Sequence, residues 1–249
     1  LLNACGGGGG GAGGAASYTV PSCTDSGTRD TEYLFMGSYG DGGNGLTRVC
    51  ASAAYARDAT GDGIKVAVLD TGITVNGSNA VFHTELDANV ATFTSGSDLI
   101  GTDNVPNDEE GHGSHVAGII AGENNGSGYH GVAYDATLYI YKVLNDSGSS
   151  VGNSIASGIT KARGDGVDIM NLSLGDSGTI GSTCNSASSC ETSLGSTLYT
   201  ELEASGAAGK ILVWAAGNDG NSSPSVMSGA AIYDDDFKET TVIVVATGT

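Results

Sequence analysis

The sequence predicts an α/β fold, a parallel sheet with helices on both of its faces. Five short segments are rich in Val, Ile, Leu and Tyr, and most are apolar on both faces, as buried parallel strands are. Segments with helix-compatible spacing lie between them, so strands and helices alternate along the chain. This order requires crossover connections, which we expect to be right-handed.

The predicted elements run through most of the chain. The first strand, Ile64–Leu69, lies in the stretch "GIKVAVLDTGI" and leads directly into Asp70. The other predicted strands are Thr137–Val143, Asp168–Leu172, Ile211–Ala215 and Thr241–Ala246. The predicted helices between them are His115–Ala121, Asn153–Arg163 and Ser193–Ala208.

Length and charge restrict the domain count and the partners. The chain has 249 residues, of which 39% are hydrophobic, enough for one well-buried domain or two small ones. Its net charge of −19 and its pI of about 4.1 repel polyanions. We therefore expect no nucleic-acid partner, and we expect a monomer. No stretch is long and apolar enough to span a bilayer.

The N-terminal segment has a different composition. Residues 1–16 read "LLNACGGGGGGAGGAA", and their Gly-rich part predicts a flexible tether. Leu2-Asn3-Ala4-Cys5 is similar to a bacterial lipobox, in which Cys5 would carry a lipid and provide the only membrane contact. The chain would then start inside its own signal peptide; the alternative is a free cysteine beside a disordered tail. Residues 17–54 are a lead-in segment, and residues 55–249 form the main domain.

The four remaining cysteines are Cys23, Cys50, Cys184 and Cys190. An even number fits an oxidising compartment, so we expect export. Cys184 and Cys190 enclose five residues of a Ser-rich loop, a separation that a disulfide closes easily, which leaves Cys23 to pair with Cys50. No C-x-x-C spacing is present, which argues against a structural zinc site or a thioredoxin-like motif.

Asp70-Thr71-Gly72 matches the tripeptide that holds a catalytic carboxylate in aspartic proteases. Such enzymes need two of these tripeptides in a mainly β fold, which the alternating helices argue against. Asp70 closes a buried strand, and carboxyl ends of parallel strands gather catalytic groups. The best partner is His112 in "EEGHGSHVAGIIAGE", whose flanking glycines let the backbone bend around the imidazole. The pair suggests a carboxylate-oriented general base.

Five ordered stretches carry a family resemblance. "VAVLDTGI", "HGSHVAGIIAG", "GVAYDATLYIYKVL", "VDIMNLSLG" and "ILVWAAGNDG" resemble the successive landmarks of subtilisin-like serine peptidases, the subtilases. The resemblance covers about residues 55–249 and implies a subtilisin-like fold. It also implies a serine endopeptidase that hydrolyses polypeptides through an Asp-His-Ser triad.

The resemblance implies a role for each matched residue. Asp70 would orient His112, and His112 would accept the proton of a serine hydroxyl. Asn218 would donate a hydrogen bond to the oxyanion. Ser173-Leu174-Gly175 would line the primary specificity pocket. Gly148-Ser149-Ser150 would form an edge strand that pairs with an extended substrate.

Two departures from the family pattern occur. Ser114 replaces the usual Thr of the His motif, a minor change because both carry a hydroxyl. The Gly-Thr-Ser-Met-Ala motif of the nucleophile is absent, and Ser228 in "VMSGA" comes too soon after Asn218, so we interpret it as a loop serine. We expect the nucleophile and the C-terminal part of the fold beyond residue 249, and this chain alone to be inactive. The alternatives are an inactive peptide-binding module and a metal-dependent hydrolase that uses His112 and His115.

The resemblance also bears on cofactors and location. It implies that the chemistry requires no cofactor and no catalytic metal. A structural calcium ion is compatible with the acidic loops "DNVPNDEEG" and "YDDDF", for which solvated loops are the alternative. The lipobox-like start and the glycine tether resemble surface-anchored bacterial subtilases of the autotransporter kind. This implies an exported protein at the outer membrane or cell surface, or one released from it.

Overall fold

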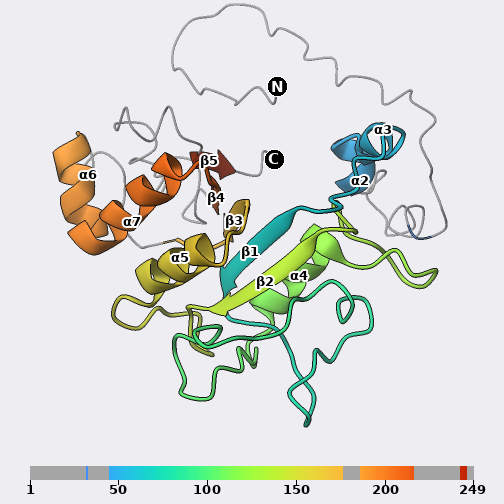
Figure 1. Ribbon diagram of the computed structural model, residues 1–249, viewed down its shortest axis with the longest axis horizontal. Coiled ribbons are helices and arrows are strands. Elements are labelled where there is room, and N and C mark those ends of the chain that lie inside the picture. Colours follow the sequence, from blue (N-terminus) through green and yellow to red (C-terminus); the bar gives the residue numbers. More distant parts are fainter. Residues whose placement is uncertain (1–31, 33–44, 176–185, 216–241, 246–249) are drawn as a thin grey trace, which may run out of the picture.

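Five strands form one parallel sheet in the computed structural model, which describes residues 32, 45–175, 186–215 and 242–245 (Figure 1). The strands are β1 (Lys65–Asp70), β2 (Thr137–Lys142), β3 (Ile169–Leu172), β4 (Ile211–Ala215) and β5 (Val242–Val245). Their order in the sheet is β2-β1-β3-β4-β5, and every neighbouring pair is parallel. The predicted α/β fold is confirmed.

Helices pack on both faces of this sheet. Helix α4 (His112–Ala121) contacts β1 and β2 on one face, whereas α5 (Ser154–Gly164) and α7 (Ser196–Ala207) pack against each other on the opposite face (Figure 1). Alternate residues of β1 point to opposite faces, since Val66 and Val68 join the core beneath α4 while Ala67 and Leu69 join the core beneath α5. This two-sided burial explains the continuous apolar run of β1.

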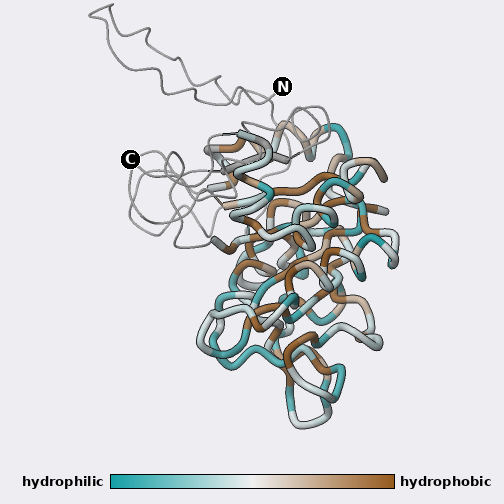
Figure 2. The backbone as a smooth tube through the Cα atoms, turned by 90° about the vertical axis from the view of Figure 1, so that its left-hand side faces the viewer, coloured by the Kyte–Doolittle hydropathy of each residue, from teal (hydrophilic) through white to brown (hydrophobic). Residues whose placement is uncertain are grey.

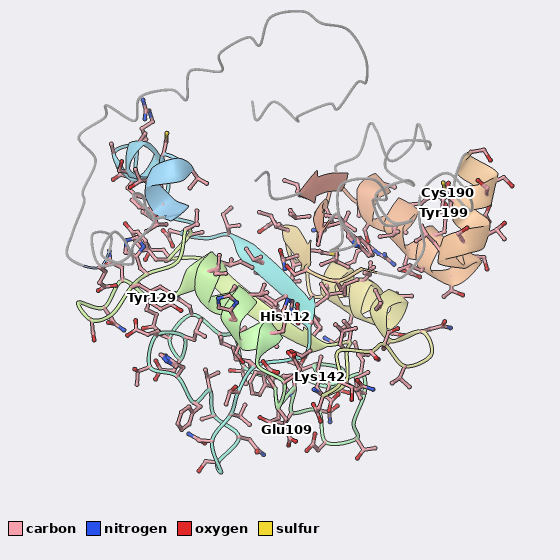
Figure 3. The ribbon with its side chains drawn as sticks, turned by 180° about the vertical axis from the view of Figure 1, so that it is seen from behind. Glu109, His112, Tyr129, Lys142, Cys190 and Tyr199 are labelled. Atoms are coloured by element: carbon pink, nitrogen blue, oxygen red, sulfur yellow. The ribbon has the colours of Figure 1, made fainter. Side chains whose placement is uncertain are left out.

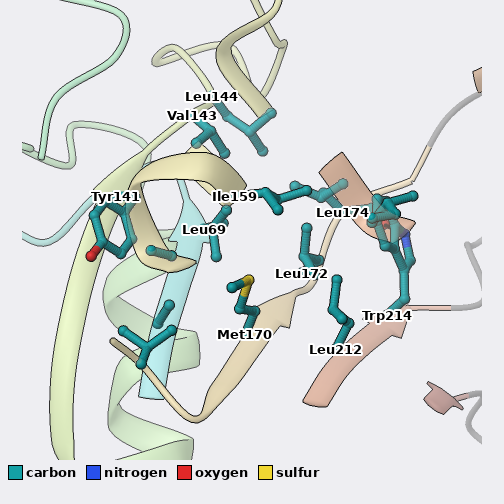
Figure 4. Close-up of a cluster of buried hydrophobic side chains, with 14 of the residues drawn as sticks. Leu69, Tyr141, Val143, Leu144, Ile159, Met170, Leu172, Leu174, Leu212 and Trp214 are labelled. Atoms are coloured by element: carbon teal, nitrogen blue, oxygen red, sulfur yellow. Dashed lines mark hydrogen bonds between the residues drawn. The ribbon is translucent and has the colours of Figure 1, made fainter. Parts of the chain in front are cut away.

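The larger core lies between the sheet and helices α5 and α7. Figure 4 shows Leu69, Met170 and Leu212 of three neighbouring strands packed beneath Ile159 of α5, next to Trp214. All five side chains are at most 2% exposed. In Figure 2 the hydrophobic segments run through the interior, and most hydrophilic segments lie on outer loops. No helix of the described part of the chain has the length and apolar character that a membrane span requires.

Several helix boundaries differ from the prediction. Helix α4 begins at His112 rather than at residue 115. The helix predicted over Ser193–Ala208 is interrupted at Gly195, whose φ of 81° ends α6 (Ala187–Leu194) before α7 begins. Helix α6 occupies part of the stretch predicted as the Ser-rich cysteine loop, because Ser186 caps its first turn through a capping box with Ser189.

Two short helices lie in and beside the predicted lead-in segment. These are α2 (Gly45–Arg48) and α3 (Ala51–Tyr55), so the boundary placed between residues 54 and 55 falls inside α3. The Tyr55 hydroxyl donates to the carbonyl of Val132 at 2.8 Å, and its ring packs against Tyr134. The lead-in helices are thus attached to the main domain by a buried aromatic contact.

Candidate active site

The site is built where β1 ends. Asp70 is the last residue of β1, which lies between β2 and β3, and it stands in register with Lys142 of β2. Its backbone carbonyl accepts hydrogen bonds from the amides of Val143 and Leu144 at 2.9 and 3.1 Å. The position of the Asp70 carboxylate is therefore fixed by the sheet itself.

Asp70 and His112 form a hydrogen-bonded pair. His112 Nδ1 lies 2.7 Å from Asp70 Oδ1, which also accepts the amide of Thr71 at 2.7 Å. Asp70 is fully buried, whereas 46% of the His112 side chain is exposed. Burial raises the pKa of Asp70, and the hydrogen bonds from His112 and Thr71 offset only part of this effect. The hydrogen bond with Asp70 raises the pKa of His112 above its ordinary value.

Close backbone packing brings the start of α4 to the end of β1. A Cβ on Gly113 would lie 2.3 Å from the carbonyl oxygen of Gly72 and 3.2 Å from Asp70 Cβ, so only glycine fits here. Its amide donates to Thr71 Oγ1 at 2.8 Å. Gly111, with a φ of 103°, supplies the turn that precedes His112. Gly111 thus bends the backbone as the sequence indicated, whereas Gly113 lies within α4 and allows close packing instead.

A second buried carboxylate, Asp108, holds the same helix start. Its oxygens accept the amides of Gly111 and Ser114 at 2.7 and 2.9 Å and the Ser114 hydroxyl at 2.6 Å. Burial would raise the pKa of Asp108, but these hydrogen bonds outweigh it and the pKa is lowered. These hydrogen bonds tie Asp108 to the start of α4, which is a structural role and differs from the paired carboxylates of an aspartic protease.

A cavity of about 490 Å³ opens beside His112. The predicted substrate-contact residues line it together with His112: these are Gly148, Ser149, Ser150, Ser173, Leu174 and Gly175. Trp214 Nε1 donates to the carbonyl of Leu174 at 2.8 Å and so fixes the second of these segments to the core. The structure thus brings His112 of the ionisable pair and both predicted segments to a single cavity.

The segment Gly148-Ser149-Ser150 is not the regular edge strand that was predicted. It is the returning arm of a tight hairpin, in which Leu144 and Ser150 form an antiparallel bridge. The side chain of Asn145 accepts the amides of Ser147 and Ser149, both at 3.0 Å, and Gly148 has a φ of 70°. This turn chemistry takes up backbone donors that a regular strand would leave free.

Several predicted residues lie outside the described part of the chain. They are Asn218, Ser228, Cys5, Cys23, Cys184 and the acidic loop "YDDDF". Cys50 and Cys190 are each disulfide-bonded, and the partners predicted for them are among these residues. In the loop "DNVPNDEEG", Glu109 and Glu110 are exposed, as a solvated loop requires, but Asp108 is buried.

The described residues offer no support for a histidine metal site. His115 is exposed on α4 rather than packed into the core. His112 has one ring nitrogen engaged by Asp70. The described ranges contain no cluster of three or more His, Cys, Asp or Glu side chains that could hold a metal ion.

The sequence did not single out Thr71, Asp108 or Lys142 as parts of the site. Lys142 is the least expected, because its side chain is buried and its Nζ donates to the Thr71 carbonyl at 2.7 Å. Figure 3 shows His112 and Lys142 at the same end of the sheet, with Glu109 farther out. No pattern in the sequence marks this role, because it depends on the strand register that pairs Lys142 with Asp70.

The fold and the pair together define an α/β protein with a carboxylate-oriented imidazole at the carboxyl edge of a parallel sheet. Comparison with known families is more specific. The model of the Subtilase family matches residues 61–249, which is more than half of the chain. The chain therefore belongs to the subtilase family, as its sequence landmarks predicted.

Individual relatives agree with this assignment. The chain is 43% identical to Subtilisin Savinase of Lederbergia lenta over 148 residues, which are 58% of this chain and 51% of that protein. It is 39% identical to Subtilisin BL of the same organism over 184 residues, 73% of this chain and 57% of the relative. Among solved structures, Sphericase matches with a TM-score of 0.50 and 33% identity, covering 66% of this chain and 48% of that one. The chain thus spans about half the length of these relatives.

Proposed function

We propose that this chain carries the acid–base part of a serine endopeptidase site. The observation that carries the proposal is the hydrogen bond between buried Asp70 and half-exposed His112 at the wall of a cavity. Asp70 holds Nδ1, which leaves Nε2 of His112 as the ring nitrogen that accepts a proton. Asp70 then stabilises the imidazolium that forms.

The remaining parts of the proposed reaction rest on the resemblance to the subtilases. A serine, which we expect beyond residue 249, gives its proton to His112 Nε2 as its oxygen attacks the substrate carbonyl. His112 returns that proton to the leaving amine, and water completes the hydrolysis by the same route. Asn218 donates to the oxyanion, and the polypeptide binds along residues 148–150 and 173–175. No cofactor is required for these steps.

The test compares this chain with a longer product of the same gene that includes a Gly-Thr-Ser-Met-Ala-like motif. We expect the longer protein to cleave unstructured polypeptides and to react covalently with a serine-directed phosphonate. Asp70→Asn and His112→Ala in it should each lower turnover on the order of 10⁴-fold, because the triad acts as a unit. The 249-residue chain should be inactive.

His115→Ala is the matched control, because His115 is exposed on the same helix and lies three residues after His112. It should leave turnover unchanged. Loss of activity in His115→Ala, together with inhibition by chelators, would instead support the metal-dependent hydrolase. A long chain that binds peptides without cleaving them would support the inactive binding module. A short chain with phosphonate-sensitive activity would place the nucleophile within residues 1–249.

A structural calcium ion is compatible with a different acidic group from those that the sequence suggested. Glu32 is 2% exposed, and its Oε2 has no hydrogen-bond partner. Burial and the charge of Glu32 raise the pKa of nearby Glu85, to which Asn125 donates at 3.4 Å. Carboxylate oxygens are calcium ligands, so Glu32 and Glu85 would hold the ion, which would neutralise the two buried carboxylates.

Calcium binding at this group is tested by thermal unfolding. Added calcium should raise the unfolding temperature of the chain, because an ion that binds only the folded state stabilises it. Glu85→Gln should remove the increase, and Glu109→Gln, which changes an exposed acidic residue, should retain it. An increase that is equal in both variants would refute this assignment.

We also propose export, with Cys184–Cys190 and Cys23–Cys50 disulfides and a lipid on Cys5. The support for the disulfides is that Cys50 and Cys190 are both disulfide-bonded. Peptide mapping without reductant should recover these two pairs, and free thiols at Cys184 and Cys190 would remove the argument for export. The lipid is tested by mass spectrometry of the complete product from a bacterium that processes lipoproteins. A mature protein that retains residues 1–4 without added lipid mass would refute it.

A further inference from the structure

Lys142 places a positive charge in the interior. It is 6% exposed, and its side chain runs beneath the site rather than out to solvent. Its Nζ donates to the Thr71 carbonyl at 2.7 Å and to Asp146 Oδ1 at 2.6 Å. Burying an ammonium group is costly, and apolar residues often replace such groups without loss of stability. The contacts of Lys142 therefore suggest a role other than stabilising the fold.

The first contact joins Lys142 to the residue that organises the ionisable pair. Thr71 donates its amide to Asp70 Oδ1 at 2.7 Å, and its Oγ1 accepts the amide of Gly113 at 2.8 Å. Thr71 thus contacts both the carboxylate and the helix start that carries His112. Its third polar group, the carbonyl, is the one that Lys142 holds. Without that bond the Thr71–Gly72 peptide loses this side-chain donor, and the Thr71 side chain that accepts the Gly113 amide is held less firmly.

The second contact joins Lys142 to the wall of the cavity. Asp146 lies in the hairpin closed by the bridge between Leu144 and Ser150, and residues 148–150 of this hairpin line the cavity with His112. The Asp146 side chain is 51% exposed, so water can solvate its carboxylate if Lys142 is lost. One ammonium group thereby ties the hairpin to the peptide next to Asp70.

We propose that Lys142 is a positioning residue that fixes the Thr71 peptide and the hairpin at residues 144–150 relative to the Asp70–His112 pair. This inference rests on the proposed function for its catalytic meaning, but its geometric content does not need the nucleophile. The side-chain hydrogen bonds of Lys142 go to Thr71 and Asp146, not to His112 or residues 148–150. Lys142 acts on the pair through Thr71 and on the cavity through Asp146.

The test uses the 249-residue chain and the charge-neutral double variant Lys142→Met/Asp146→Asn. The protonation of His112 is followed by NMR of its imidazole, assigned among the four histidines of the chain with His112→Ala. The charged groups that act on His112 are Asp70, Glu110 and Asp108, and none of them is altered. We expect the His112 midpoint to fall by about 0.5 pH unit or more, because a loosened Thr71 weakens the bond to Asp70.

Amide hydrogen exchange separates local loosening from general loss of stability. Thr71 and Gly113 should exchange about tenfold faster in the double variant, whereas Leu138 and Ile140 in the interior of β2 should keep their rates. The matched control is Lys161→Met/Asp165→Asn, which removes an i,i+4 Lys–Asp pair on and just after α5. It should change neither the His112 midpoint nor the exchange of Thr71.

An unchanged His112 midpoint and unchanged exchange at Thr71 in a folded double variant would overturn the proposal. Folding is checked by fluorescence of Trp214, the single tryptophan, which is 2% exposed. If the double variant is unfolded, Lys142→Gln/Asp146→Asn replaces it, since glutamine keeps a polar side chain but is one bond too short for the Thr71 carbonyl. The His112 midpoint and the exchange of the Thr71 amide in this second variant then test the proposal in the same way.

A kinetic measurement in the longer protein links the inference to catalysis. There the double variant should lower kcat about tenfold or more with a smaller change in KM, because the base is displaced while most of the substrate contacts remain. An unchanged kcat would overturn the catalytic part. Failure of the proposed function would look different, since a longer protein without activity would still show the shift of the His112 midpoint.

Discussion

Replacing Ser114 by alanine tests how the start of α4 is held. The Ser114 hydroxyl donates to Asp108 Oδ2 at 2.6 Å and accepts the amide of Thr74 at 2.9 Å. Alanine would remove one hydrogen-bond donor from the Asp108 carboxylate, which is 4% exposed, and would remove the acceptor of the Thr74 amide. At about 1–3 kcal/mol for each of the two groups that lose a partner, the chain should lose about 2–6 kcal/mol of unfolding free energy.

The assay is urea unfolding followed by Trp214 fluorescence at neutral and acidic pH. Because hydrogen bonds lower the pKa of Asp108 in the folded state, this carboxylate stabilises the fold above its ordinary value of 3.8. That stabilisation disappears as the pH falls through the lowered pKa. The difference between the wild type and Ser114→Ala should therefore be full near neutral pH and smaller below about pH 4.

Ser114→Thr is the matched control, since it restores the residue usual in this family and keeps the hydroxyl. It should unfold within about 1 kcal/mol of the wild type. The reasoning is refuted if the threonine variant loses as much stability as the alanine variant. It is also refuted if the loss in Ser114→Ala has the same size at every pH, because the Asp108 carboxylate would then not be involved.

Two further predictions concern the same helix start and the imidazole. Gly113→Ala should cost about 1–3 kcal/mol of unfolding free energy and break the hydrogen bond between Asp70 and His112, because the new Cβ would lie 2.3 Å from the Gly72 carbonyl oxygen. Gly164→Ala is the control: no atom lies within 4 Å of its Cβ, so this variant should be as stable as the wild type or more stable in the same urea assay. Asp70→Asn should lower the NMR midpoint of His112 to 6.5 or below. Because the pKa of His112 is raised in the folded state, protonated His112 stabilises the wild type at low pH, and this stabilisation is lost as the pH rises through the raised pKa. Asp70→Asn should not show this loss of stability with rising pH. An equal pH dependence of stability in both proteins would contradict the prediction.

The sequence was sufficient for the sheet and for the ionisable pair. Buried parallel strands must be apolar on both faces, so β1 was visible as a short run of Val, Ala and Leu that ends in an acidic residue. Gly111 before His112 indicated a special backbone, and its φ of 103° is one that favours glycine. In both cases the local backbone or burial requirement restricts which residue types can occur at the position.

Other features could not be predicted from residue type. A lysine at the end of a strand is usually exposed, and only the register between β2 and β1 reveals that Lys142 reaches Thr71. Asp108 stands among exposed acids, and its burial depends on hydrogen bonds to the start of α4. Helix α6 was missed because its serines carry no apolar periodicity, and its first turn depends on the capping box of Ser186. These features arise from tertiary contacts.

The position of β1 between β2 and β3 also sets the order in which the molecule can assemble. Lys65 pairs with Thr137 and Val68 pairs with Asn171, so no partner of β1 is near it along the chain. Such non-local pairing slows folding, because a long loop must close before any contact forms. At synthesis rates of about 5–20 residues per second, the apolar strand waits for roughly 5–20 s between the emergence of Asp70 and that of Asn171. The ribosome thus makes the buried carboxylate early, while the fold encloses it late.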